Sequence, residues 1–368
     1  MNNTILVFSK LKSQVNFEDT EKIKLDEPLH PYIGYNWSLS IRKLGFIVEY
    51  LNSKRSERLA RSLLLDWFYN YLTLPSSYNI LVVHSTNGLL RTTILRLFNL
   101  NKEIIYYYLS LPNPDGGKVK KIIRRICVFF DCLSASKVVY GLDCLINEFP
   151  LNSFSSKAIY FPFYVDFNFF QRQLEIDQSN LKWPIKFVLI VGDITRDDDY
   201  VYKELKHITI PVIRITRDLI VVERVRNLFN ESRGDLVLTG ISFNELAHLY
   251  RNSLCCITAS KYDHWQPGGI TSMVESFACG GICISNSNGQ IQSEFNFLSQ
   301  RHNFEDPTIY YSYPKRGELV KIINYLEKLG DDSISIMKNK SQKFAYTCFN
   351  FNSIGEIELN KLFNEYRN

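Results

Sequence analysis

The sequence has few features of an exported or membrane-spanning protein. No window contains the roughly 18 consecutive apolar residues that a membrane-spanning helix needs. The first apolar run, residues 5–8, is short and is followed by Lys10 and Lys12, the reverse of the order in a signal peptide. We therefore expect a cytoplasmic protein, either soluble or lying peripherally on the inner face of the plasma membrane.

The cysteines lack the spacing of a zinc site. The eight cysteines form no CxxC pair. Cys255, Cys256, Cys279 and Cys283 lie in apolar segments, where a thiol acts as a small hydrophobic side chain. Cys279 and Cys283 with His264 are an alternative zinc ligand set. We expect buried, reduced thiols and no metal in the site.

Charge of one sign is in small excess. The net charge is +5, and no nucleic-acid-binding motif accompanies it, so we expect no nucleic-acid partner. Positive charge is concentrated in residues 118–130, which contain the basic residues Lys118, Lys120, Lys121, Arg124 and Arg125. The apolar residues of the same segment include Ile122, Ile126, Phe129 and Phe130. This composition predicts a helix that contacts an anionic membrane; the alternative is a core-facing helix with a solvated basic side.

Core-forming residues are abundant. Hydrophobic residues make up 45% of the chain and aromatic residues 14%, and 368 residues suit two domains better than one. Apolar runs at residues 5–9, 80–84, 104–109 and 137–140 predict parallel strands of a first domain, with helical segments such as residues 55–72 between them. A continuous apolar run that ends in Gly192 predicts the first strand of a second domain.

Residues 260–285 carry the strongest functional signal. Gly268 and Gly269 lie in a loop after a strand-like run, and Ile270 and Thr271 open a helical pattern that a second glycine pair ends. The start of a helix has N–H groups without internal partners and partial positive charge. The segment therefore predicts a phosphate site that needs no metal. The alternative is an ordinary helix cap in an α/β domain.

Glu275 is the acid most suited to this site. It lies one turn after Thr271 on the same helix face, from which its carboxylate can point back toward the loop. The segment resembles the donor-binding segment of GT-B glycosyltransferases, above all glycosyltransferase family 4, whose pattern reads roughly EGFGLxxLEAMACGxPVIAS. Glu275, Ala278, Cys279 and Gly280 match that pattern. The resemblance implies retaining transfer from a nucleotide sugar, with Glu275 accepting hydrogen bonds from the two ribose hydroxyls.

The chain departs from the family at the first glutamate of the pattern. Counted back from Glu275, that position is Pro267, and counted from the loop glycines it is Gln266. We expect Gln266 to hydrogen-bond a sugar hydroxyl, while Asp263 and His264 are alternative replacements.

The resemblance covers most of the chain, though its motifs are specific only over residues 235–289. It implies the α/β GT-B fold, in which two Rossmann-like, doubly wound domains face each other across a cleft and the last helix crosses back to the first domain. We expect an acceptor domain over residues 1–170, a linker over 171–184, a donor domain over 185–345 and the returning helix over 346–368. Ser242 and Glu245 predict a capping box at the start of one donor-domain helix.

Cleavage of a sugar diphosphate releases negative charge that basic side chains must stabilise. The family has an arginine after the first glycine of the second domain and a lysine five residues later, whereas this chain has Asp193 and Asp198. We expect Arg196, in the loop after Gly192, to supply the cation. Other cationic candidates are Arg214, Arg217 and Lys261. The alternative role of Arg196 is to neutralise the aspartates that follow it.

Two segments of the first domain complete the predicted site. His84 follows an apolar strand and is expected at the carboxyl edge of the sheet, where the family places a histidine near the donor sugar. Tyr35 and Asn36 lie where the family has its first glycine-containing loop, and we expect them on the acceptor side. Both segments have ordinary loop roles as alternatives.

These features together predict a glycosyltransferase that moves a sugar from a nucleoside diphosphate sugar to a glycan or lipid-linked acceptor. Retention and a place in surface polysaccharide biosynthesis are implied by the resemblance, and no cofactor besides the donor is expected. Inversion would instead need His84 or Asp263 as a base. Two alternatives stay open: a nucleotide-sugar epimerase or hydrolase on the same fold, and a degenerate GT-B protein that binds a sugar nucleotide without turnover.

Overall fold

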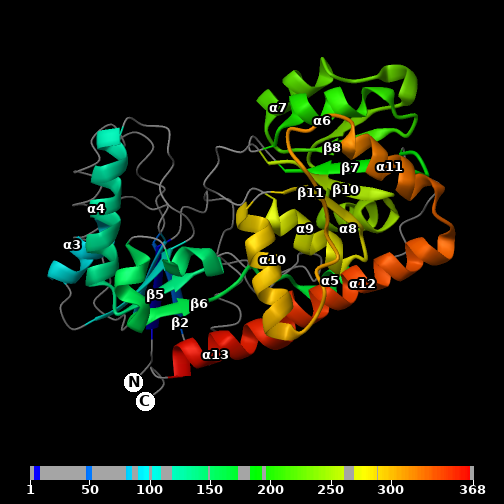
Figure 1. Cartoon of the computed structure of the whole chain (residues 1–368). Helices are drawn as coiled ribbons and strands as arrows, with labels where there is room; N and C mark the ends of the chain where they lie inside the picture. Colours follow the sequence, from blue (N-terminus) through cyan, green and yellow to red (C-terminus); the bar gives the residue numbers. More distant parts are fainter. Residues whose placement is uncertain are drawn as a thin grey trace. The chain divides into compact units, whose positions relative to one another are not determined.

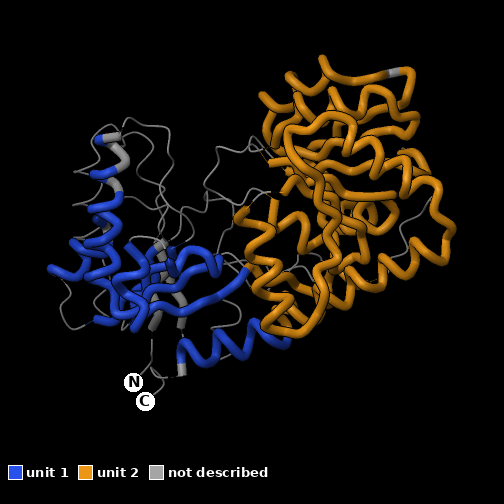
Figure 2. The backbone as a smooth tube through the Cα atoms, viewed as in Figure 1, with its two compact units in different colours: residues 1–24, 29–162, 353–368 blue, residues 25–28, 163–352 orange. Residues whose placement is uncertain are grey.

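The computed structural model describes residues 4–8, 47–51, 80–84, 90–98, 102–108, 118–147, 150–172, 183–192, 196–260, 269–287 and 289–364 (Figure 1). The chain divides into two compact units (Figure 2). Unit 1 consists of residues 1–24, 29–162 and 353–368, and unit 2 consists of residues 25–28 and 163–352. Each unit contains one parallel β-sheet with helices, as the alternation of apolar runs and helical patterns predicted.

In the described part of unit 1, the sheet has six parallel strands in the order β2-β1-β3-β4-β5-β6. Their bounds are β1 Thr4–Phe8, β2 Ile47–Leu51, β3 Ile80–His84, β4 Glu103–Tyr108, β5 Lys137–Tyr140 and β6 Ala158–Tyr160. The four strands expected from apolar runs are all present, with ends within one residue of the prediction. Residues 80–83 are completely buried, as continuous apolar strands are in parallel sheets covered by helices.

Asp131 links helices α3 and α4 of unit 1. The described helical elements are α3 Arg91–Phe98, α4 Lys118–Ser134, η3 Asp143–Asn147, η4 Leu151–Lys157 and α13 Glu356–Asn364. Asp131 of α4 accepts hydrogen bonds from the backbone N–H groups of Leu90 (2.9 Å) and Thr93 (3.0 Å), so it caps the start of α3. Burial raises the pKa of the Asp131 carboxyl to about 6. The helix predicted over residues 55–72 lies outside the described residues.

The described residues of unit 2 form a sheet of six parallel strands in the order β12-β11-β10-β7-β8-β9. Their bounds are β7 Val188–Val191, β8 Val212–Ile215, β9 Leu236–Leu238, β10 Cys255–Thr258, β11 Cys283–Asn286 and β12 Ile309–Tyr311. The chain starts at β7, runs outward through β8 and β9, and then crosses to β10 on the other side of β7. The carboxyl ends of β7 and β10 therefore form a topological switch point, the usual ligand position in open α/β sheets.

The described helices of unit 2 comprise one before β7 and others after it (Figure 1). They are α5 Phe167–Gln171, α6 Asp198–Glu204, η6 Leu205–His207, α7 Leu219–Arg226, η7 Glu231–Arg233, α8 Phe243–Asn252, α9 Ile270–Ala278, α10 Gly289–His302, α11 Glu318–Lys328 and α12 Asp331–Phe349. The predicted capping box of α8 is confirmed: Ser242 Oγ accepts from Glu245 N (3.2 Å), and Glu245 Oε2 accepts from Ser242 N (2.7 Å). No described helix is long and apolar enough to cross a bilayer.

The segment expected to form one helix over residues 346–368 is divided. Helix α12 continues to Phe349, a π-helical turn η8 spans Phe351–Gly355, and α13 begins at Glu356. The break occurs because Val165 pairs with the backbone on both sides of Asn350: Val165 N donates to Phe349 O (2.7 Å), and Phe351 N donates to Val165 O (2.9 Å). Asn350 accordingly has an extended backbone.

Candidate functional site

The candidate site lies at the switch point of unit 2, where helix α9 begins. Gly269 is the N-cap of α9 and has a φ of +115°, which favours glycine. A Cβ at this position would lie 2.1 Å from Thr258 Cγ2, at the carboxyl end of β10. The first helical residues, Ile270 and Thr271, follow directly. The start of α9 thus lies tightly against the sheet edge, and Gly269 permits this contact because it has no side chain.

Arg196 joins the two central strands at this edge. The residue is only 3% exposed, and its backbone forms an isolated antiparallel bridge with Ser260, just beyond β10. Its Nε donates to the carbonyl oxygen of Val191 (2.9 Å), the last residue of β7, and its Nη2 donates to Ser272 Oγ (3.0 Å) in the first turn of α9. The guanidinium group is so close to Gly192 that a Cβ there would meet Nη2 at 2.5 Å.

The surroundings of Arg196 disfavour its positive charge and lower its pKa. Burial, and then the nearby positive charge of Arg214, lower the pKa of the Arg196 guanidinium to about 10, so it stays protonated at neutral pH. A buried cation at the start of a helix adds to the partial positive charge of that helix end. The combined field favours an anion at this place.

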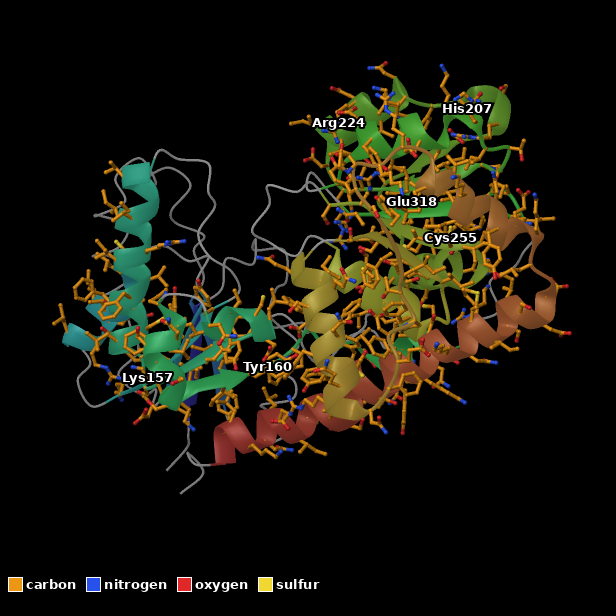
Figure 3. All side chains as sticks on the ribbon, in the orientation of Figure 1. Lys157, Tyr160, His207, Arg224, Cys255 and Glu318 are labelled. Carbon is orange, nitrogen blue, oxygen red and sulfur yellow. The ribbon has the colours of Figure 1, made fainter. Side chains whose placement is uncertain are left out.

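Asp198 has ionic partners other than Arg196, of which Arg214 is buried and Arg224 is partly exposed. Arg214 Nε lies 2.8 Å from Asp198 Oδ1, and Arg224 Nη2 lies 2.6 Å from Asp198 Oδ2. Arg224 is labelled in Figure 3. Asp197 instead caps α6 by accepting a hydrogen bond from Tyr200 N. Arg214 is thus engaged in the core of unit 2, and neutralisation of Asp198 does not depend on a hydrogen bond from Arg196.

Glu275 lies on α9, one turn from its start, and is 8% exposed. Its Oε2 accepts a hydrogen bond from the hydroxyl group of Tyr250, at 3.1 Å, from the buried face of α8. Burial raises the pKa of the Glu275 carboxyl to about 7, against the lowering effects of the Tyr250 hydrogen bond and the charge of Arg217. Arg217 follows β8, is exposed, and has its Cζ 5.8 Å from the centre of the Phe243 ring.

The carboxyl end of α9 follows the predicted glycine stop. Gly280 has a φ of +77°, its N–H donates to Phe277 O (2.9 Å), and Gly281 N donates to Ser276 O (2.7 Å), which is a Schellman motif. Cys279 and Cys283 are buried, and burial raises the pKa of both thiols. Among the described residues, no group of three or more His, Cys, Asp or Glu side chains is placed to hold a metal ion.

The structure therefore brings Gly192, Arg196, Gly269 and the start of α9 together in unit 2. His84 ends β3 at the carboxyl edge of the sheet in unit 1, and its backbone pairs with Tyr107. The remaining predicted site residues lie outside the described residues; they are Tyr35, Asn36, Lys261, His264, Gln266 and Gly268.

The sequence did not predict the roles of two residues that contact the site, Ser272 and Tyr250. Ser272 accepts a hydrogen bond from Arg196 and donates one to Gly269 O (2.9 Å). Tyr250 belongs to the apolar face of α8 and carries no motif of its own, so its pattern predicts only a core residue. Its separation of 25 residues from Glu275 becomes a contact only through the packing of α8 on α9.

No protein-family model matches the sequence, and no curated protein matches it significantly. Solved structures do match. The structure of Anabaena HepE in complex with UDP and glucose has a TM-score of 0.65, with 14% identity and 98% of each chain covered. The α,α-trehalose-phosphate synthase (UDP-forming) of Burkholderia vietnamiensis has a TM-score of 0.59, with 10% identity and 100% of each chain covered.

A third structure, the N-terminal domain of Candida albicans trehalose-6-phosphate phosphatase, has a TM-score of 0.62 at 12% identity, and the match covers 99% of this chain and 96% of that one. At such low identity these matches concern the arrangement of the backbone. Two parallel α/β sheets with their helices match glycosyltransferase structures over the full length. The chain has the GT-B fold, as the sequence predicted.

Proposed function

We propose that this protein is a glycosyltransferase that takes a sugar from a UDP-sugar and moves it to a glycan or lipid-linked acceptor. The observation that carries the proposal is the buried Arg196 guanidinium beside Gly269 and the start of α9, at the switch point of the unit 2 sheet. A cation, a helix start and a glycine that permits close backbone approach are the elements of a diphosphate site. The structural match to HepE in complex with UDP and glucose supports UDP as the nucleotide.

The described residues have distinct roles in this proposal. The diphosphate is held by backbone N–H groups at the start of α9, including those of Ile270 and Thr271. Arg196 stabilises the charge that develops as the bond between sugar and phosphate breaks, and Gly192 leaves room for its side chain. Glu275 accepts hydrogen bonds from the ribose hydroxyls.

Other predicted residues remain part of the proposal by their sequence positions. Gly268 belongs to the loop before α9, and Gln266, Lys261 and His264 are donor-side residues of that same loop. His84 acts near the transferred sugar. Tyr35 and Asn36 are assigned to the acceptor side.

In this proposal, residues 1–170 bind the acceptor and residues 185–345 bind the donor. Transfer with retention needs no dedicated base, because the departing phosphate takes the acceptor proton. Surface polysaccharide biosynthesis at the inner face of the plasma membrane is the setting we propose.

The experiment is a two-stage screen on the full chain. UDP, GDP and ADP, and then their sugar conjugates, are tested for binding by isothermal titration calorimetry. Those that bind are tested for sugar release and transfer. We expect UDP to bind and a UDP-sugar to be consumed with an acceptor present. Failure of every nucleotide to bind would overturn the proposal, and free sugar without acceptor product would favour an epimerase or hydrolase.

A degenerate GT-B protein that binds the donor without turnover is a second candidate, and two observations favour it. The Arg196 guanidinium already donates to Val191 and Ser272, and Asp198 occupies the position of the expected lysine and is itself neutralised by Arg214. UDP binding without turnover of any donor, across a panel of glycan and lipid-linked acceptors, would favour this candidate.

A further inference from the structure

Helix α4 of unit 1 has an exposed apolar stripe. Its members recur at helical spacing on one face, and they are Val119, Ile122, Ile123, Ile126, Phe130 and Leu133. Ile122 is 57% exposed and Ile126 is 48% exposed. Of the 14 exposed large hydrophobic residues in the described part of the chain, six lie on this helix, so the stripe is a concentration rather than ordinary scatter.

The opposite face of α4 packs into unit 1. Val128, Cys132 and Asp131 are buried, and Asp131 caps α3. Phe129 contacts Phe154 of η4, with ring centroids 5.1 Å apart, so it faces inward. The sequence pattern groups Phe129 with the apolar residues of the stripe, and the structure separates it from them. The helix therefore already has its core-facing side, and the apolar stripe is a second hydrophobic surface.

The charges of α4 oppose its dipole. Its first turn contains Lys118, Lys120 and Lys121 and no acid, and its last turn contains no basic residue. Positive charge at a helix start destabilises the helix, because that end already has partial positive charge. The three lysines of the first turn thus weaken the isolated helix, and an anionic surface beside them would offset that cost.

We propose that α4 lies on the surface of an anionic lipid bilayer, with the apolar stripe in the interface and the basic residues at the lipid headgroups. The charge pattern selects the partner: five basic residues within the first eight positions of α4 suit the anionic headgroups around a shallow apolar contact better than an uncharged apolar partner. The proposal rests on α4 alone and does not depend on the donor site in unit 2.

The first test neutralises charge. The full chain is sedimented with vesicles of phosphatidylcholine alone or mixed with phosphatidylglycerol. The test variant is Lys120→Ala, Lys121→Ala, Arg124→Ala, Arg125→Ala. The matched control removes four basic residues of unit 2 that are exposed, through Lys203→Ala, Lys206→Ala, Arg226→Ala, Lys321→Ala, and so lowers the net charge equally. We expect the α4 variant to bind anionic vesicles at least about tenfold more weakly than the wild type, while the control binds nearly as well.

The second test removes apolar surface. Ile122→Ser with Ile126→Ser is compared with Ile185→Ser and Ile336→Ser, which alter two exposed isoleucines of unit 2. We expect only the α4 pair to lose vesicle binding, with unchanged UDP binding in both. Equal binding by the α4 variants and their controls would overturn the proposal. The proposal would also be overturned if the wild-type protein did not bind anionic vesicles, even if it bound acidic proteins.

Discussion

Tyr250 donates a hydrogen bond of 3.1 Å to the carboxyl group of Glu275, and both residues are buried between α8 and α9. Burial drives the carboxyl toward its neutral form and outweighs the opposing effects of the Tyr250 hydroxyl group and the charge of Arg217, so the pKa of Glu275 is raised to about 7. The proposed ribose-binding acid thus changes its charge near neutral pH, and Tyr250 tunes where this happens.

The first prediction is that UDP affinity depends on pH through Glu275. The carboxyl is mostly protonated below a pKa of about 7 and ionised above it. A carboxylate accepts hydrogen bonds from two ribose hydroxyls more strongly than a carboxylic acid does, so affinity should rise as pH increases through that value, by about fivefold. Calorimetry over a pH series measures it. Glu275→Gln, which does not ionise, is the control; a rise of equal size in this variant would assign the effect to the UDP phosphate.

The second prediction concerns Tyr250 as a positioning residue. Tyr250→Phe removes the hydrogen bond that lowers the pKa of Glu275, so the pH at which UDP affinity rises should move upward. The free energy of unfolding should fall by about 1–3 kcal/mol, because a buried carboxyl group loses its donor. Denaturant unfolding and the same calorimetric series measure the two effects. A purely structural tyrosine would give the stability loss with an unmoved pH profile.

Local signals predicted much of the fold. Continuous apolar runs indicated the strands because parallel strands are buried on both faces, and the Ser242 and Glu245 capping box was readable because it spans three residues. The pairing of Asp198 with Arg214 was not readable, because it requires α6 and β8 to lie together, 16 residues apart in sequence. The same limit applies to the candidate site. Arg196 was chosen by its place in a loop, whereas its contact with Ser272 spans 76 residues.

The third prediction tests Arg196 as the cation at the developing charge. Arg196→Ala should lower the rate of sugar transfer by about 10²–10³-fold, the size of effect seen when one donor to a developing oxyanion is removed. Arg226→Ala, an exposed arginine on α7, is the matched control and should leave the rate unchanged. Comparison of kcat with the KM for the donor separates the roles. A loss confined to KM would show that Arg196 only helps to bind the donor.

The fourth prediction concerns stability at α8. Ser242→Ala removes the side-chain acceptor of Glu245 N and one half of the capping box. The expected loss is about 1 kcal/mol, which corresponds to a fall in Tm of about 2–4 °C for a unit of this size. Scanning calorimetry measures it. Ser333→Ala, at an exposed position within α12, is the control and should change Tm little. An unchanged Tm in Ser242→Ala would mean that water replaces the cap without loss.

The last prediction tests whether the close approach of Gly269 is needed for donor binding. Gly269→Ala places a Cβ 2.1 Å from Thr258 Cγ2 at a φ of +115°, so the start of α9 must move away from β10. We expect a loss of about 2 kcal/mol or more in stability, from strain and overpacking. UDP affinity should fall as well, because the N–H groups of α9 and the Arg196 guanidinium lose their common geometry.

Gly289→Ala is the matched control: a Cβ at Gly289 meets nothing within 4 Å, and an alanine there should be neutral or stabilising. If Gly269→Ala folds with lowered Tm but binds UDP as tightly as the wild type, the diphosphate does not lie against the start of α9, and the proposed site is wrong even where the fold is right.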